Sequence, residues 1–296
     1  MEAKLSEQPV CAVIVTYHPS VAMLTNLQNV MAEVQGLVVV DNGSGANELD
    51  ALRAASQELG FHLIENGTNL GIAEALNQGV RWAKTEGYPW VLLLDQDSRM
   101  SDGFVEAMLE TWLFHPKPDQ AVSIHPRYFD PVIGRFGIYA PRAADGSPVW
   151  SMTSGALMPV WIFDKIGWFL SDFFIDWVDI EYCFRIRKAG YLIAESQQAV
   201  LVHAPGRTSP ACVFGFQFWP SHHSPARRYY MFRNRVVVFR KYLFSLPYMT
   251  LKAMSASFRD TVKCFLGEKD RSRKFRSFLR GTWDGLIGRM GMREGL

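Results

Sequence analysis

The chain has 296 residues, of which 48% are hydrophobic and 20% charged. These proportions are ordinary for a globular protein, and the length allows one large domain or two small ones. The formal net charge of +2 gives no reason to expect a nucleic-acid partner.

The charge is unevenly distributed along the chain. Residues 226–296 contain 17 basic and 5 acidic residues, a net +12, whereas residues 1–225 contain 14 and 24, a net −10. An acidic body joined to a basic C-terminal region predicts contact with anions, for which phosphates and anionic lipid head groups are both candidates.

The cysteines and the apolar runs indicate the compartment. Cys11, Cys183, Cys212 and Cys264 are far apart and include no Cys-x-x-Cys pair, which argues against a zinc site and a disulfide framework. No run approaches 18 apolar residues, and the first nine residues do not resemble a signal peptide. We therefore expect reduced thiols and a cytoplasmic protein.

Strands and helices alternate over the first hundred residues. Strand-like runs at 10–16, 37–40, 61–64 and 90–94 are separated by helical apolar patterns at 20–34, 47–59 and 72–84. This alternation predicts an α/β fold with a mainly parallel sheet and crossover helices. Neither a Gly-x-Gly-x-x-Gly motif nor a P-loop follows the first strand, so the usual dinucleotide and nucleoside-triphosphate motifs are missing.

The fourth strand ends in two carboxylates. The segment WVLLLDQDS (90–98) is a buried strand followed by Asp95 and Asp97. Ligands of open α/β sheets bind at the carboxyl ends of strands, and paired carboxylates suit Mg²⁺ or Mn²⁺. Taken alone, the pair is also typical of an Asp-rich turn.

The remaining elements are less regular. We expect helices at 103–114, at 161–167 and in the second part of 173–188, short strands at 191–194 and 200–202, and strands and loops over 119–150. A basic-aromatic cluster opens a helix at 225. Arginines surround the apolar face of a helix at 271–280, which is the composition of an amphipathic helix on an anionic membrane surface. Packing against other helices is the alternative.

Seven sequence blocks in one order resemble a known family. They are VIVTYH (13–18), VVVDNGS (38–44), NLGIAEALNQG (69–79), LLLDQDS (92–98), TSGALM (153–158), FFIDWVDIEYCFR (173–185) and LVHAPG (201–206). The set resembles the inverting family 2 glycosyltransferases. DQDS, and IDWVDIE followed by ARRYYMFRN (226–234), resemble the L-rhamnosyltransferase branch.

The resemblance implies a GT-A fold, a Rossmann-like mixed sheet flanked by helices. It places the transferase domain at 1–225, with nucleotide-sugar binding at about 10–100 and the acceptor and catalytic base region at 101–225. The basic C-terminal helices occupy 226–296. The implied reaction moves L-rhamnose from dTDP-L-rhamnose to a lipopolysaccharide core, an O-antigen or a rhamnolipid-like acceptor. A divalent metal, Mg²⁺ or Mn²⁺, is the expected cofactor. The expected place is the cytoplasm, with peripheral contact at the inner membrane.

The resemblance also assigns roles to single residues. Nucleotide binding would use Thr16, Tyr17, Asp41, Asn69, Gly71, Asn77 and Asp95. The metal ligands would be Asp97, Asp95 and His203, and the diphosphate would meet Arg228 and Arg233. Asp179 aligns with the catalytic base and Asp176 is the alternative. The acceptor would contact Ser154, Gly155 and Glu181.

The pattern around the base departs from that of the family. The common Glu-Asp-x-Asp is here Val178-Asp179-Ile180-Glu181, which leaves the choice between Asp179 and Asp176 open. Each site residue also has a plain interpretation, such as a turn at Asp41, a helix cap at Asn69 or a hydrogen-bonded histidine at His203. Two other enzymes fit in part, a UDP-hexose transferase and a sugar nucleotidyltransferase, and a non-catalytic nucleotide-sugar binding protein is a further alternative.

Overall fold

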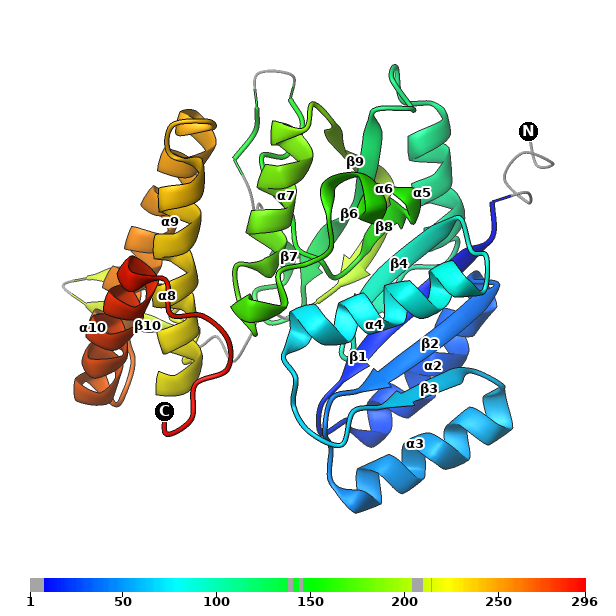
Figure 1. Cartoon of the computed structure of the whole chain (residues 1–296), viewed down its shortest axis with the longest axis horizontal. Helices are drawn as coiled ribbons and strands as arrows, with labels where there is room; N and C mark the ends of the chain where they lie inside the picture. Colours follow the sequence, from blue (N-terminus) through cyan, green and yellow to red (C-terminus); the bar gives the residue numbers. More distant parts are fainter. Residues whose placement is uncertain (1–7, 138–140, 144–145, 204–209, 214) are drawn as a thin grey trace.

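A computed structural model describes residues 8–137, 141–143, 146–203, 210–213 and 215–296 (Figure 1). Residues 204–206 of the LVHAPG block lie outside this part of the chain. Among the described residues, no helix combines the length and the apolar character that are needed to cross a bilayer.

The first hundred residues form the predicted parallel half of the sheet. Its strands are β1 (Val10–Thr16), β2 (Gly36–Asp41), β3 (His62–Glu65) and β4 (Trp90–Asp95), and its helices are α2 (Val21–Glu33), α3 (Ala46–Leu59) and α4 (Ile72–Thr85). The strand order is β3-β2-β1-β4, and β1 pairs in parallel with both β2 and β4. The carboxyl ends of β1, β2 and β4 therefore meet at one edge.

The sheet continues past β4 with strands of mixed direction. These are β5 (Arg99–Met100), β6 (Ala121–Asp130), β7 (Arg135–Phe136), β8 (Ala156–Pro159) and β9 (Leu192–Val202), and the order after β4 is β8-β6-β9-β5. Strand β8 is antiparallel to β4 and β6, while β6 and β9 are parallel. The expectation of two short strands at 191–202 is wrong: they are one strand with an irregularity in its pairing with β6. A separate hairpin joins β10 (Ala211–Val213) to β11 (Phe216–Phe218).

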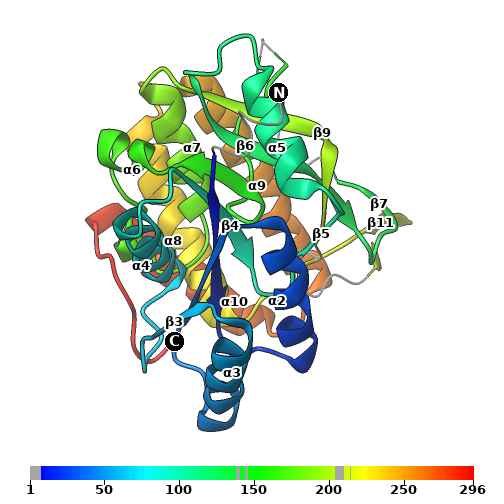
Figure 2. The same ribbon diagram turned by 90° about the vertical axis from the view of Figure 1, so that its right-hand side faces the viewer.

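Helices cover both faces of the sheet (Figure 2). Alternate residues of each buried strand point to opposite faces, and two apolar clusters result. One cluster takes in α2 and α5 (Phe104–Leu113), and the other takes in α4, α6 (Trp161–Ile166) and α7 (Val178–Lys188). A short 3-10 turn, η1 (Ser171–Phe173), precedes α7.

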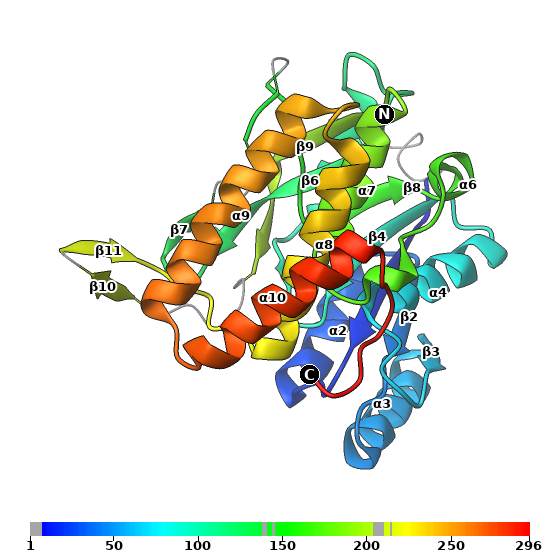
Figure 3. The ribbon, with the colours of Figure 1, turned by 60° about the vertical axis from the view of Figure 1, so that its left-hand side comes forward.

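Three helices complete the chain, α8 (Pro225–Tyr242), α9 (Pro247–Gly267) and α10 (Arg271–Ile287). Val238 and Tyr242 of α8 belong to the same apolar cluster as α7. Helices α9 and α10 lie outside α8, on the side that comes forward in Figure 3. The helical region thus begins where the basic-aromatic cluster predicted it, and α8 packs directly on the α/β core.

Candidate active site

Three side chains that could hold a metal ion meet at the carboxyl edge of the sheet. Asp95 ends β4, Asp97 lies in the turn that follows, and His203 follows β9. One ligand atom from each lies within 4.8 Å of the others. His203 Nε2 is 3.9 Å from Asp95 Oδ2, and His203 Nδ1 is 3.7 Å from Asp97 Oδ1. Two carboxylates and an imidazole form a donor set that suits Mn²⁺ or Mg²⁺.

Strand pairing brings these distant residues together. The two-residue strand β5 runs antiparallel to β9, with Arg99 opposite Val202. Because Asp97 stands two residues before Arg99 and His203 directly follows Val202, the pairing sets the two side chains beside each other. Asp97 is 64% exposed and His203 is buried, so the cluster opens to solvent on the side of Asp97.

A chain of hydroxyl groups supports the cluster from behind. The Asp95 N–H donates to Ser154 Oγ (3.0 Å), Ser154 Oγ and Ser98 Oγ are 2.8 Å apart, and Ser98 Oγ is 3.1 Å from His203 Nδ1. A hydroxyl both donates and accepts, so the chain fits either neutral tautomer of the imidazole. Ser154 was expected to contact the acceptor, but it is buried behind the ligands. Ser98, which sequence reasoning did not single out, belongs to the site.

The electrostatics of the cluster favour a cation. Burial raises the pKa of Asp95 above its ordinary value, and the Asp97 carboxylate raises it further, whereas His203 opposes the shift. Two nearby carboxylates repel each other, so ionising both costs free energy unless a positive charge lies beside them.

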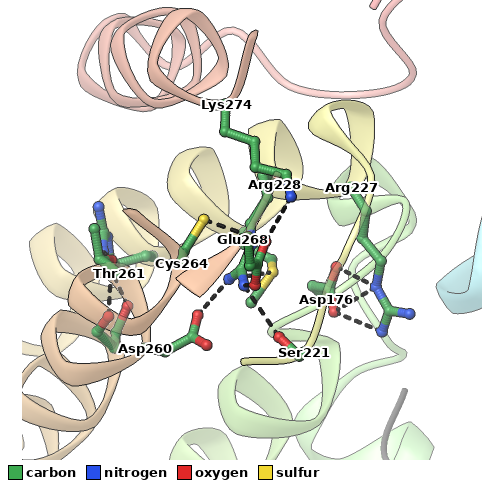
Figure 4. Close-up of polar contacts among 12 residues, drawn as sticks. Asp176, Ser221, Arg227, Arg228, Asp260, Thr261, Cys264, Glu268 and Lys274 are labelled. Carbon is green, nitrogen blue, oxygen red and sulfur yellow. Dashed lines mark hydrogen bonds and ion pairs between the residues drawn. The ribbon is translucent and has the colours of Figure 1, made fainter. Parts of the chain in front are cut away.

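Asp179 and Asp176, the two candidates for the base, differ in their partners. Asp176 forms a bidentate ion pair with Arg227, at 3.0 Å from Nε to Oδ2 and 3.0 Å from Nη2 to Oδ1 (Figure 4). Asp179 lies in the first turn of α7, where its Oδ1 accepts a hydrogen bond from the Ile180 N–H (2.7 Å). Burial raises the pKa of Asp179 to about 6, and Asp176 and Asp95 add to the shift.

The backbone before α7 is strained and clamped. Phe174, Asp176 and Trp177 have φ values of 63°, 64° and 65°, a region that costs free energy for residues other than glycine. Asn234 Nδ2 of α8 donates to the carbonyls of Phe173 (2.9 Å), Ile175 (2.9 Å) and Asp176 (2.8 Å). Helix α8 therefore fixes the segment that carries Asp176 and leads into Asp179.

The structure corrects the two arginines that were expected at the diphosphate. Arg233 is buried, and its Nη2 donates to the carbonyls of Asp172 (2.9 Å) and Phe173 (3.0 Å). Arg228 is buried between Asp260 and Glu268 (Figure 4). Both guanidinium groups hold α8 in place. Their neighbour Arg227 has a side chain that is 41% exposed; it pairs with Asp176, and its charge opposes the rise in the pKa of Asp95.

Two further expectations are corrected by burial. Asn77 was expected at the nucleotide, but it is buried and exchanges hydrogen bonds with the backbone of Phe169, at 2.9 Å to the carbonyl and 3.0 Å from the N–H. Glu181 was expected at the acceptor, but it is buried and accepts bonds from Arg185 Nε (2.8 Å), Lys241 Nζ (2.7 Å) and the Tyr242 hydroxyl (2.7 Å). Both side chains join elements of the fold.

Gly71 and Gly155 occupy tight positions. A Cβ on Gly71, whose φ is 86°, would lie 2.6 Å from the Phe174 carbonyl oxygen, and the Ile72 N–H donates to that oxygen (2.7 Å). The loop before α4 thus touches the strained segment. Gly155, at φ 82°, would press a Cβ against Pro126. Contact of either residue with a substrate stays a prediction.

The predicted nucleotide residues gather at the ends of β1 and β2. Thr16 Oγ1 donates to Asp41 Oδ1 (3.2 Å), and Asp41 Oδ2 accepts from the Ser44 N–H (3.0 Å). Both residues are buried, whereas Tyr17 is 47% exposed beside them. Gln96, between the two acidic residues, accepts from the Tyr17 N–H (2.9 Å) and donates to its carbonyl (3.2 Å). Gln96 thereby connects this region to the edge that carries Asp95 and Asp97.

The loop after β3 continues the same surface. Asn69 Oδ1 accepts from the Gly71 N–H (2.9 Å) and from Asn42 Nδ2 (3.1 Å). These bonds give Asn69 the turn-forming role that its position before α4 allows, and a role at the ribose stays a prediction.

Comparison with known sequences adds independent information. Residues 11–142 match the family described as Glycosyl transferase family 2. The chain is 28% identical over 293 residues to the dTDP-rhamnosyl transferase RfbF of Shigella flexneri, covering 94% of this chain and 95% of that protein. It is 25% identical over 267 residues to the low-salt glycan biosynthesis hexosyltransferase Agl10 of Haloferax volcanii, covering 82% and 81%.

Solved structures share the fold at low sequence identity. Residues 1–349 of TarS from S. aureus superpose with a TM-score of 0.62 at 15% identity, covering 95% of this chain and 82% of that one. The mannosyltransferase PcManGT from Pyrobaculum calidifontis, solved with GDP-Man and Mn²⁺, superposes with a TM-score of 0.57 at 16% identity, covering 96% and 89%. The expected GT-A-like mixed sheet flanked by helices is confirmed.

Proposed function

The chain belongs to glycosyltransferase family 2, and on that premise we propose that it transfers L-rhamnose from dTDP-L-rhamnose with inversion. The observation that carries the proposal is the Asp95–Asp97–His203 cluster at the same sheet edge as the turn that leads to Asp179. The similarity to a relative named as a dTDP-rhamnosyl transferase supports this donor. The acceptor would be a bacterial glycan or glycolipid, of the lipopolysaccharide core, O-antigen or rhamnolipid kind.

Asp97, Asp95 and His203 would hold the divalent cation. When bound, such a cation neutralises negative charge on the leaving diphosphate. The protein's contribution is the geometry, because the hydroxyl chain through Ser154 and Ser98 orients Asp95 and His203 before a ligand arrives.

Asp179 would act as the general base. It would take the proton from the acceptor hydroxyl while that oxygen attacks the anomeric carbon opposite the departing diphosphate. A carboxylate with a pKa of about 6 accepts a proton more readily than an ordinary one and is still ionised at neutral pH. The Arg227 guanidinium ties up both oxygens of Asp176, which favours Asp179 over Asp176.

The nucleobase would bind where β1 and β2 end. Asp41 would accept the imide N–H of thymine or uracil beside Thr16, Tyr17, Asn69 and Gly71. Its oxygens already accept bonds from its own turn, one of them from the Ser44 hydroxyl. That hydroxyl rotates freely, so it is the bond that an incoming imide would replace.

An enzyme that glycosylates such glycolipid acceptors would meet them at a membrane surface. We place the enzyme in the cytoplasm, held peripherally at the inner membrane by its C-terminal helices. A sugar nucleotidyltransferase is less favoured, because Tyr17-His18-Pro19 stands where a Gly- and Lys/Arg-rich phosphate loop would follow the first strand.

A donor screen tests the proposal. Purified protein is given dTDP-L-rhamnose or UDP-hexoses with Mn²⁺ or with a chelator, and sugar transfer or donor hydrolysis is detected by mass spectrometry. We expect metal-dependent turnover of the dTDP donor and its loss in Asp97→Ala. Turnover of UDP-hexoses alone would replace the proposed donor, and diphosphate binding without any turnover would favour a non-catalytic binding protein.

A further inference from the structure

We propose that the outer faces of α9 and α10 form a docking surface for a membrane rich in anionic lipids. Its apolar stripe consists of Leu251, Phe258 and Leu266 on α9 and Phe275, Leu279 and Trp283 on α10. The inference concerns how the enzyme is held, and it does not depend on which sugar is transferred.

Helix α9 turns one apolar stripe inward and another outward. Its buried residues, such as Ala253 and Cys264, face the rest of the protein, whereas Phe258 is 68% exposed on the opposite side. Leu251 and Leu266 lie seven residues before and eight residues after Phe258, a spacing that puts all three on one helical face. A soluble surface rarely exposes such a row of large apolar side chains without a partner.

Helix α10 packs on α8 through small residues, and three of its large apolar residues face outward. Its small residues pack on α8: a Cβ on Gly281 would lie 2.5 Å from the Tyr229 carbonyl oxygen. This close approach leaves no space for a side chain at Gly281. Phe275, Leu279 and Trp283 lie on the opposite face, and Trp283 is 62% exposed.

The charges around the stripe are almost all positive. Over residues 247–287, eight lysines and arginines are exposed, and Asp270 is the one acidic residue that is exposed. The other acids are used inside. Asp260 and Glu268 pair with Arg228, and Glu268 also pairs with Lys274 (2.6 Å; Figure 4). Asp284 is buried and accepts a hydrogen bond from the Tyr229 hydroxyl (2.7 Å). The interior network therefore removes negative charge from the surface.

The two helices present one continuous surface. The rings of Phe265 and Phe275 are 6.2 Å apart across the junction of α9 and α10, and both helices lie on the same side of the molecule (Figure 3). A second copy of this surface would set its cations against like charges. A membrane with anionic lipids fits both features of the surface. The apolar side chains would insert at the acyl boundary, and the lysines and arginines would bind the anionic head groups.

The test is co-sedimentation of the full chain with vesicles. Neutral phosphatidylcholine vesicles are compared with vesicles that also contain phosphatidylglycerol. We expect binding to the anionic vesicles, weakened by salt. Lys263→Ala and Arg280→Ala should each weaken it about fivefold, and the double variant Phe258→Ser/Trp283→Ser at least about tenfold.

The matched control is Phe114→Ser/Trp161→Ser, which removes two exposed aromatic residues, Phe114 63% and Trp161 47% exposed, outside α9 and α10. It should bind vesicles as the parent does. Thermal unfolding shows that each variant is folded, and donor hydrolysis in detergent-free buffer shows whether the active site is intact. Loss of vesicle binding with hydrolysis retained supports docking separately from the transferase proposal.

Three results would overturn the inference. One is no binding of the folded parent to anionic vesicles, and another is equal loss in the control and the stripe variant. The third is a stable dimer in light scattering that the stripe variant dissociates while vesicle binding is absent, which would assign the surface to a second copy.

Discussion

Two clusters of charged side chains in this protein have opposite designs. At the sheet edge, Asp95 and Asp97 lie beside His203 and form no ion pair with a lysine or arginine among the described residues, and Asp97 is open to solvent. Between α8, α9 and α10, the two cations Arg228 and Lys274 pair with the two carboxylates of Glu268 and Asp260. Charge left unmatched at an accessible edge favours a ligand, whereas charge matched in the interior serves the fold.

The largest expected effect on activity comes from a substitution near the cluster at the sheet edge. Asp179→Asn keeps the shape of the carboxyl group and removes the proton acceptor, so we expect kcat to fall about 10³-fold. Transfer rates are measured with saturating donor and acceptor. Asp176→Asn serves as the control, and a larger loss there than in Asp179→Asn would move the base to Asp176.

The matched cluster should instead affect stability. Glu268→Gln removes the buried countercharge of Lys274 and one of the two carboxylates that pair with Arg228, and we expect the free energy of unfolding to fall by about 3 kcal/mol, measured by denaturant titration. Donor hydrolysis at low temperature should persist, because no substrate group is involved. A loss of hydrolysis in the folded variant would contradict the structural role.

The same cluster predicts an acid response. Hydrogen bonds from Lys274 and Arg228 lower the pKa of Glu268 from 4.5 to about 2 in spite of burial. A lowered carboxyl pKa contributes stability that is present above the unfolded value and is lost as pH falls towards the folded one. Between about pH 4.5 and 2, Glu268→Gln should therefore lose less stability than the parent.

A smaller effect on kcat is expected at Asn234, which joins α8 to the strained segment before α7. Asn234→Ala removes the donor to three carbonyls of the strained segment, and the turn that leads to Asp179 should relax. We expect kcat to fall about tenfold to a hundredfold, with the KM for the donor unchanged. A variant whose kcat is unchanged would show that the strain is held by other contacts.

The smallest expected effect is a pH dependence of kcat/KM, which tests whether Asp179 is the base. Because burial raises the pKa of Asp179 to about 6, and only the ionised carboxylate accepts a proton, kcat/KM should rise with pH through about 6 and level off above it. A rate profile over this range checks the prediction. The Asp179→Asn variant should lack the inflection, and an unchanged inflection there would assign it to another group.

Much of the sheet followed from local pattern. The strands and helices of the first hundred residues lie within a few residues of their predicted ranges, because period and turn residues act over short distances. The prediction of strands and loops over 119–150 is confirmed, because β6 and β7 lie there. The pairing of β6 could not be predicted, because its partners β8 and β9 come later in the chain and leave no local signature in its sequence.

The sequence by itself determined which residue types stand at the ends of β1, β2 and β4, and so the kind of ligand that edge suits. Only the tertiary structure decided which arginine pairs with Asp176. Successive residues on a helix point about 100° apart, so Arg227 reaches Asp176 while Arg228 turns into the interior. Which of these directions is inward depends on how α8 packs against α7, α9 and α10, and no local pattern carries that information.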